Sequence, residues 1–219
     1  MKRMVQFLAA ILLASLVGAC ISTSTASYTA PSHRNSSLKS KRVLVMYNDR
    51  NIGLRRAAET AMVAALRKNG VNADNSMDLL PPGKLWHRRD VQAAAQSVRH
   101  KYEYFFAMGG ALGVDKSYVP PTYVPGQSSS QVNVIGNTAY VTTTTTPGYT
   151  IGGGVVHLPR GRFAAWLHKF EDLRTDGKSS PAVWKSQTGA GGSRGVDFIE
   201  LTKRAVSETM QQLKKDGLL

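Results

Sequence analysis

The chain has 219 residues, of which 42% are hydrophobic and 8% aromatic, enough for one domain of ordinary size with its own core. Its 28 lysines and arginines stand against 14 acidic residues, and the formal charge of +14 favours anionic partners such as phosphorylated glycans, lipid headgroups or nucleic acid. The same charge is typical of a solvated basic surface. A single cysteine, Cys20, excludes an intramolecular disulfide.

The first residues have the layout of an export signal. Lys2 and Arg3 form a positively charged start, and the run from Val5 to Ala19 is almost wholly apolar. This run is shorter than the ~18–20 residues that a helix needs to cross a bilayer, and it ends in small residues. We therefore predict a cleavable signal peptide over residues 1–19.

The end of this run, Val17-Gly18-Ala19-Cys20, resembles the lipobox of bacterial lipoproteins. The resemblance implies a diacylglycerol on the Cys20 sulfur, cleavage between Ala19 and Cys20, and an N-acyl chain on the new amino end. The alternatives are an uncleaved anchor or ordinary cleavage near Ala26 or Ala30. Residue 21 is Ile and not Asp, which by the same resemblance favours the periplasmic face of the outer membrane. We expect no cofactor besides this covalent lipid.

Residues 20–40 are rich in Ser, Thr and Ala and show neither a helical nor a strand period. We interpret this segment as a flexible tether between the lipid and a domain that spans residues 41–219.

The first half of that domain alternates apolar runs with amphipathic segments. Leu54, Ala58, Met62 and Leu66, for example, recur on one helical face. The predicted elements are a buried strand at 42–47, a helix at 52–69 closed by Gly70, a strand within 71–80, a helix at 90–100 and a central strand at 102–108.

Between Lys116 and Arg160 the sequence contains no Asp, Glu, Lys or Arg. The segment is rich in Thr, Val and Tyr, which favour strands, and Gly136-Asn137 and Pro147-Gly148 are turn signals. We predict a β-hairpin or arm over residues 117–160, inserted between two halves of the domain. An uncharged strand edge of this kind can pair with another chain, so an oligomer is expected as one alternative.

The remaining elements are predicted as a strand at 163–173, a turn at Asp176-Gly177, a strand at 182–188, a glycine-rich turn at 189–195 and a helix at 196–215. Together the elements predict a mixed α/β fold: one domain with about five to six strands and about three helices packed on the sheet.

Asp172-Leu-Arg-Thr-Asp-Gly-Lys178, followed by Ala182-Val-Trp184, resembles the "D-x-x-T-G-K … V-W" hairpin of small periplasmic lipoproteins. These include the curli-secretion channel subunit, exopolysaccharide lipoprotein subunits and activators of penicillin-binding proteins. Asp176 is an insertion relative to that pattern, and the gap to Trp184 is longer. The resemblance implies an outer-membrane lipoprotein with a small α/β domain, and it bears on fold more than on activity.

The densest basic and aromatic cluster is Trp86, Arg88 and Arg89, with Lys84 and Arg99 nearby. These residue types stack on rings and pair with phosphates or carboxylates, so we take them as a candidate anionic-ligand patch. The alternative is a loop that enters the following helix with its charges in water. No nucleic-acid motif accompanies the cluster, so an envelope protein or an anionic glycan is the expected partner, and nucleic acid is not.

Gly191-Gly-Ser193-Arg-Gly195 matches the G-x-S-x-G pattern of hydrolases, but no histidine follows Ser193. We therefore favour a helix-capping role for Ser193 over a nucleophile and expect no catalytic residues. The histidines have no metal-ligand spacing, so we expect no metal site. They are His33, His87, His100, His157 and His168.

These patterns favour a membrane-anchored, non-enzymatic binding or scaffold lipoprotein of the cell envelope. The main alternative is an oligomeric export or pore subunit of the curli-secretion-channel type, in which the 117–160 segment enters the membrane. Val132, Val134, Ala139 and Val141 begin the apolar face which that role needs, but threonines then replace it. A serine hydrolase at Ser193 is the least favoured reading.

Overall fold

A computed structural model of the chain describes residues 20–34, 36–135, 138–174, 176 and 178–219, without the side chains of residues 132–141. The predicted signal peptide therefore lies outside the described residues. The chain divides into two units, Met1–Val114 with Leu158–Leu219, and Asp115–His157. The elements are β1 (Ile21–Thr29), η1 (Pro31–His33), β2 (Arg42–Tyr47), α2 (Ile52–Lys68), β3 (Asn72–Asn75), α3 (Arg88–Ser97), β4 (Tyr104–Val119), β5 (Thr122–Val124), β6 (Gln127–Ile135), β7 (Thr138–Thr146), β8 (Tyr149–Ile151), β9 (Gly154–Lys169), β10 (Trp184–Gly192) and α4 (Phe198–Lys215).

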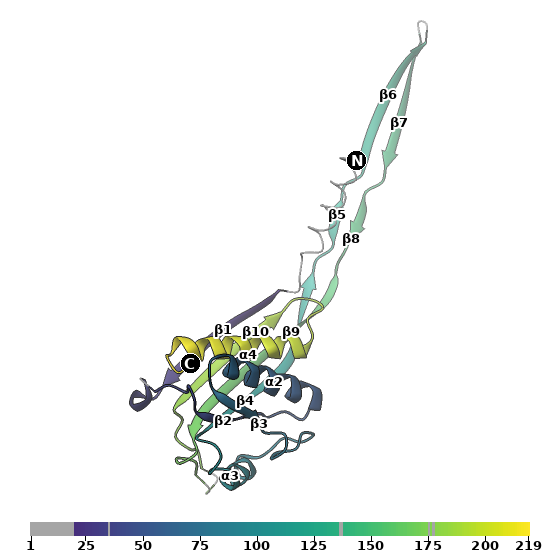
Figure 1. Ribbon diagram of the computed structural model, residues 1–219. Coiled ribbons are helices and arrows are strands. Elements are labelled where there is room, and N and C mark those ends of the chain that lie inside the picture. The colour runs from purple at the N-terminus through teal and green to yellow at the C-terminus, as the bar shows by residue number, and fades with distance from the viewer. Residues whose placement is uncertain (1–19, 35, 136–137, 175, 177) are drawn as a thin grey trace, which may run out of the picture. The chain divides into compact units, whose positions relative to one another are not determined.

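A mixed six-stranded sheet forms the first unit, in the order β1-β10-β9-β4-β2-β3. β2 pairs in parallel with β3 and β4, whereas β10 pairs antiparallel with β9 and β1. Within the described residues three α-helices accompany this sheet (Figure 1). The predicted fold class, a mixed α/β domain, is confirmed.

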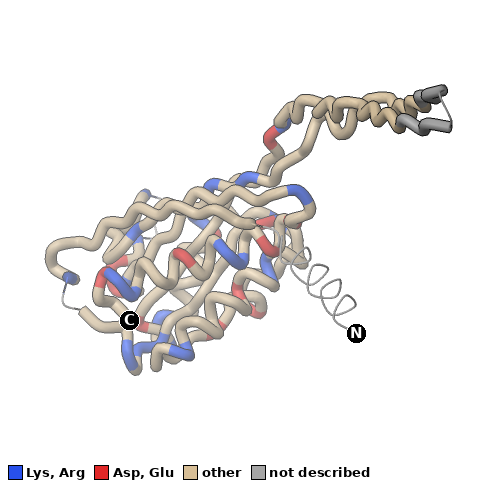
Figure 2. Tube along the Cα trace, turned by 90° about the horizontal axis from the view of Figure 1, so that it is seen from above, with Lys and Arg blue, Asp and Glu red and all other residues tan. Residues whose placement is uncertain are grey.

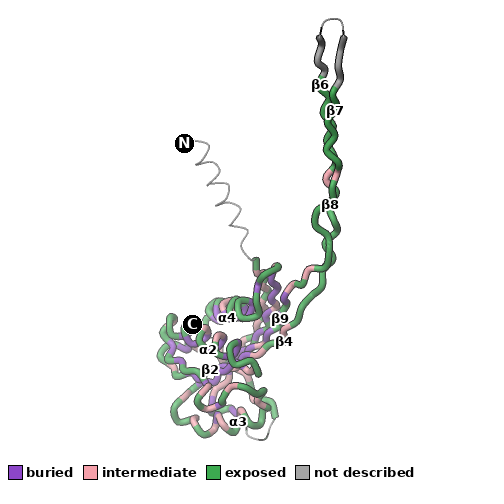
Figure 3. Tube along the Cα trace, turned by 90° about the vertical axis from the view of Figure 1, so that its right-hand side faces the viewer, coloured by how far each residue is buried: buried purple, intermediate pink, exposed green. Residues whose placement is uncertain are grey.

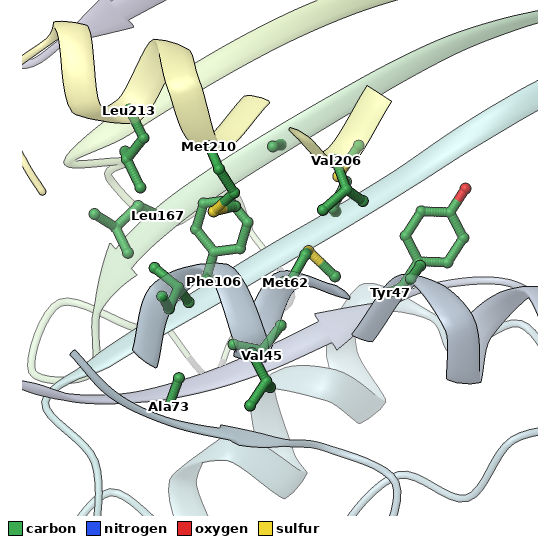
Figure 4. Close-up of a cluster of buried hydrophobic side chains, with 14 of the residues drawn as sticks. Val45, Tyr47, Met62, Ala73, Phe106, Leu167, Val206, Met210 and Leu213 are labelled. Atoms are coloured by element: carbon green, nitrogen blue, oxygen red, sulfur yellow. The ribbon is translucent and has the colours of Figure 1, made fainter. Parts of the chain in front are cut away.

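The two faces of the sheet carry separate hydrophobic cores. α2 and α4 pack on one face, where Met62, Met210 and Leu213 meet Phe106 and Leu167 (Figure 4). α3 packs on the opposite face, over side chains of β2 and β4 such as Met46 and Phe105. β2 is apolar at successive positions because it is buried on both sides, which is why the sequence predicts this strand correctly.

The helix boundaries follow from local chemistry. The Asn51 side chain accepts a hydrogen bond from the Leu54 amide at 2.9 Å and starts α2, and Gly70 follows the helix with φ 81°. The predicted capping of the last helix by Ser193 is wrong, because the Asp197 carboxylate caps α4 at the Glu200 amide, at 2.7 Å.

The predicted flexible tether at residues 20–40 is wrong, because Ile21–Thr29 form the edge strand β1. All nine residues pair with β10, from Ile21 opposite Gly192 to Thr29 opposite Trp184. Leu38, farther along the same segment, is buried. The inward side of β1 packs Ile21 against the core and is otherwise held largely by hydroxyls: Thr25 bonds to Thr188 at 3.0 Å, and Ser27 accepts from Gln212 at 3.1 Å.

The same pairing corrects the predicted glycine-rich turn. Gly189–Gly192 belong to β10, and the chain leaves the strand only at Ser193. Small residues suit this stretch because it is covered closely: a Cβ at Gly192 would collide with Val196 and Pro159.

The second unit confirms the predicted insertion as a set of β-hairpin strands. β6 pairs antiparallel with β7, and β5 pairs with β8. Outside residues 132–141 the side chains of these four strands are almost all exposed (Figure 3), and Asp115 and Lys116 are the unit's charged residues (Figure 2). Serine and threonine hydroxyls bond across the hairpin, as between Ser130 and Thr143 at 2.9 Å. The predicted turn at Gly136-Asn137 and the side chains of Val132 to Val141 lie outside the description.

Candidate functional site

Among the described residues, no helix covers one part of the sheet. On the side of α3, the outward residues of β1, β10 and β9 are exposed or half-buried, apart from Gly191. They alternate with buried residues on β9 and β10 and with half-buried ones on β1. We call these residues the open sheet face. Its members are Ser22, Ser24, Ala26, Tyr28, Lys185, Gln187, Arg160, Arg162, Ala164 and Trp166.

The strand register arranges this face in rows. Tyr28 lies opposite Lys185, which lies opposite Trp166. The Lys185 Nζ stands 5.1 Å from the centre of the Tyr28 ring, and both rings are largely accessible, at 50% for Tyr28 and 40% for Trp166. Two rows nearer Cys20, Arg162 lies opposite Gly189. The face is therefore aromatic at one end and arginine-rich at the other.

Three neighbouring hollows of about 780, 220 and 550 Å³ lie along this face. Adjacent hollows share lining residues: Ala26 and Ala164 join the first two, and Trp166 and Lys185 join the last two. Their volumes are within or near the ~300–1,000 Å³ usual for ligand sites. None of their lining residues is Asp or Glu, whereas Arg88, Arg162 and Lys185 are present.

The 550 Å³ hollow, which we call the α3 cavity, is bordered by Trp86, Arg88, Trp166 and His168. Trp86 is held at three points. Its backbone amide donates to Asn48 Oδ1 and its carbonyl accepts from Asn48 Nδ2, both at 3.0 Å. Its indole Nε1 donates to the Pro81 carbonyl at 3.1 Å. Lys84 Nζ lies 3.8 Å from the centre of the ring, so the outer face of Trp86 carries a cation.

A buried ion pair supports the loop that carries Trp86. Arg55 Nε donates to Glu59 Oε1 at 2.8 Å, and both side chains are fully buried. The Arg55 guanidinium also donates to the Leu80 carbonyl at 2.6 Å and to the Pro81 carbonyl at 3.4 Å. Glu59 in turn accepts from the Tyr47 and Ser76 amides, each at 3.0 Å. The pair thus joins α2, β2 and the loop before α3.

His168 is the titratable group of the α3 cavity. Its Nδ1–H donates to the Pro181 carbonyl at 2.7 Å, which leaves Nε2 as an acceptor in the neutral ring. Burial lowers the pKa of His168, and the nearby Arg88 cation lowers it further, against the Pro181 hydrogen bond, which raises it. The ring is therefore neutral at pH 7, and lowering the pH adds a positive charge at His168 to those of Arg88 and Lys185.

This shift predicts a pH dependence of stability. The unfolded chain binds a proton at His168 below about pH 6.5, whereas the folded protein binds it only at lower pH, so the free energy of unfolding falls as the pH drops through this interval. We expect urea unfolding at a series of pH values to show a smaller fall in His168→Gln than in the wild type. Parallel profiles of the two proteins would contradict the assignment.

The structure brings together part of the predicted ligand patch. Trp86 and Arg88 line the α3 cavity, whereas Arg89 is exposed on α3 and does not line it. Cys20 is exposed, and its carbonyl accepts a hydrogen bond from the Ser193 amide at 2.9 Å. Ala19 lies outside the described residues. The lipidation and ligand assignments of these residues stay predictions.

Two other readings concern Ser193 and a metal site. No hydrogen bond among them joins the Ser193 side chain to a histidine, and the part of the chain that the structure describes holds no group of three or more metal-ligating side chains. None of its helices is both long enough and apolar enough to cross a bilayer.

Sequence reasoning missed Tyr28, Arg162, Trp166 and Lys185. A signal was present in β9, where Arg160-x-Arg162-x-Ala164-x-Trp166 alternates with buried residues. An exposed tryptophan on a strand indicates a binding surface. The sequence alone, however, does not show that the outer side of β9 is uncovered, because this depends on the order of strands in the sheet.

No family model matches the chain, and no curated protein matches its sequence. Among solved structures, the PelC dodecamer from Paraburkholderia phytofirmans is similar over 90% of this chain and 99% of that one, with 12% identity and a TM-score of 0.46. A second PelC dodecamer, a variant from the same organism, has 10% identity, coverages of 90% and 98%, and a TM-score of 0.45. A PDZ domain protein from Parabacteroides distasonis has 9% identity, coverages of 96% and 39%, and a TM-score of 0.34. With every TM-score below 0.5, the function of this chain rests on its own residues.

Proposed function

We propose that the chain is a lipid-anchored, non-enzymatic binding protein of the bacterial envelope whose open sheet face holds an anionic glycan. The observation that carries this proposal is that Arg88, Arg162 and Lys185 line the three hollows and that no carboxylate of the described residues does. Such a lining attracts carboxylate or phosphate groups and repels none of them.

The aromatic residues indicate a sugar ring as the carrier of that charge. Tyr28 and Trp166 flank Lys185 on adjacent strands, and Trp86 borders the same α3 cavity as Trp166. A pyranose presents apolar C–H groups to an aromatic face and hydroxyls at its rim, and Gln187 and the neutral His168 ring supply partners for those hydroxyls. Three hollows in succession suit a chain of sugars better than a single small molecule.

Lipid on Cys20 would confine this face to a membrane. The exposed position of Cys20 leaves its sulfur accessible, and two or more acyl chains give durable anchoring where one is marginal. The lipobox resemblance and the Ile at position 21 support the outer membrane, with the domain in the periplasm.

The glycan proposal predicts the behaviour of Trp166→Ala. Because Trp166 borders two of the hollows and is 40% exposed, we expect the variant to bind polygalacturonate about tenfold more weakly, the order of an aromatic stacking contact, with unchanged thermal stability. Isothermal titration calorimetry measures the affinity, with neutral dextran as the uncharged comparison. Phe198→Ala, a ring of similar exposure on α4, is the matched control.

Lys185→Gln tests the electrostatic contribution to binding in the same titration. We expect weaker binding and a shallower salt dependence, because one cation is removed from the contact. If dextran binds as tightly as polygalacturonate, or Phe198→Ala weakens binding as much as Trp166→Ala, the open sheet face is not an anionic-glycan site.

A second candidate function is an oligomeric export subunit that assembles through the second unit. In the described residues, β5 with β8 and β6 with β7 form two-stranded sheets, so each has unpaired outer edges. From Ser117 to Pro159 no charged side chain protects these edges from pairing with another copy. A monomeric mass in detergent by light scattering would remove this candidate.

A further inference from the structure

No flexible linker separates Cys20 from the folded domain. Its carbonyl is bonded to the Ser193 amide at 2.9 Å, and the next residue, Ile21, already pairs with Gly192. A lipoprotein with a long linker floats above its bilayer at a variable height. In this chain the first residue after the predicted cleavage site is the first residue of the fold.

The strand that follows Cys20 is firmly embedded. β1 pairs with β10 along its whole length, Ser22 Oγ donates to the Gly191 carbonyl at 3.3 Å, and Gln212 on α4 donates to Ser27. Displacing Cys20 from the domain by even a few residues would break these contacts. The sulfur position is therefore set by the sheet.

Cations gather at the end of the sheet where Cys20 lies. Arg160 lies opposite Gly191 on the neighbouring strand, and its guanidinium extends over that glycine. Arg162 is two residues farther along β9, and Arg194 directly follows Ser193. Asp197, three residues after Arg194, is engaged in capping α4. This end complements the negative surface of an anionic bilayer.

We propose that the domain stands directly on the bilayer, with the Cys20 end of the sheet against anionic headgroups and the open sheet face rising away from them. The inference rests on the lipidation proposed above. β1 rises about 3.4 Å per residue, so Tyr28 lies up to about 20 Å farther from the surface than Ser22. Arg194, in the turn beside Cys20, then contacts lipid, while the rows from Arg162 to Trp166 stay free for the glycan.

Two exposed positions on the same side of β1 test this orientation. The full-length lipidated protein is placed in vesicles of phosphatidylethanolamine and phosphatidylglycerol that contain a nickel-chelating lipid as a surface quencher. Ser22→Cys and Tyr28→Cys variants carry a thiol-reactive fluorophore, which the thioether at Cys20 cannot take up. We expect markedly stronger quenching at position 22 than at position 28, with an intermediate value for Ser24→Cys.

Inserting about twenty Gly and Ser residues between Cys20 and Ile21 is the matched control, because it places a flexible linker between the lipid anchor and the domain. We expect the insertion to lower quenching at position 22 to the level at position 28. Equal quenching at both positions without the insertion, or the reverse order, would overturn the orientation while the anchor stands. Failure of the wild type to incorporate a palmitate analogue would instead reject the lipidation itself, and the orientation with it.

Discussion

Replacing Glu59 with alanine is expected to lower the free energy of unfolding by about 3–5 kcal/mol, the cost of breaking a buried ion pair by removing one partner. The substitution leaves the fully buried Arg55 guanidinium without its counter-charge and removes the acceptor of the Tyr47 and Ser76 amides. Because Arg55 also contacts the Pro81 carbonyl, to which the Trp86 indole donates, we expect Trp86 fluorescence to change as well. Urea unfolding measures the free energy.

The surface pair Arg204–Glu208 is the matched control for this prediction. It has the same spacing on a helix, but its 3.6 Å contact is partly solvated, so Glu208→Ala is expected to cost less than about 1 kcal/mol. The double variant Arg55→Met/Glu59→Met is expected to be more stable than Glu59→Ala, since it leaves no unpaired charge in the interior. Equal losses for Glu59→Ala and Glu208→Ala would show that burial does not make the Arg55–Glu59 pair important.

Replacing Cys20 with serine is expected to abolish lipid attachment altogether. A hydroxyl is a far weaker nucleophile than a thiolate, so the thioether to diacylglycerol does not form, and the cut before residue 20 that depends on it does not follow. Cells fed a clickable palmitate analogue should label the wild type and not Cys20→Ser. Mass spectrometry should find the variant as a precursor that still carries residues 1–19.

Ser22→Ala separates this effect from a general disturbance of β1. Ser22 is exposed and two residues from Cys20, and its substitution leaves the lipobox intact, so we expect normal labelling and processing. Palmitate label in Cys20→Ser, or a mature amino terminus near Ala26 or Ala30, would contradict the lipoprotein assignment. Cleavage near Ala26 would also cut within β1, and cleavage near Ala30 would remove the whole strand from the sheet.

The sequence predicts well those elements whose buried positions are occupied by apolar residues. Arg42–Tyr47 and the helix from Ile52 show their period in hydropathy because their neighbours are hydrophobic. β1 escaped prediction for the converse reason. Its inward positions are occupied by residues such as Thr25 and Ser27, which satisfy their hydroxyls on Thr188 and Gln212, so the alternation of its burial leaves no trace in hydropathy.

The candidate site was predicted only in part, and the missing part is informative. Trp86 and Arg88 stand out because they are neighbours in the sequence. Tyr28 lies far along the chain from Trp166 and Lys185, and only the pairing of β1, β10 and β9 places the three in one row. A cluster of that kind has no local signature.

The sequence by itself determined the α/β composition, the uncharged insertion and the position of a single cysteine behind an apolar run, since each of these depends on neighbouring residues and their hydropathy. Only the tertiary structure decided that Ile21–Thr29 close the edge of the sheet and that no described helix covers the outer side of β1, β10 and β9. The place of β1 depends on contacts between segments more than 150 residues apart, such as Ser22 with Gly191. Local propensity carries no information about which distant strand satisfies a backbone amide, and that choice sets both the open sheet face and the place of Cys20.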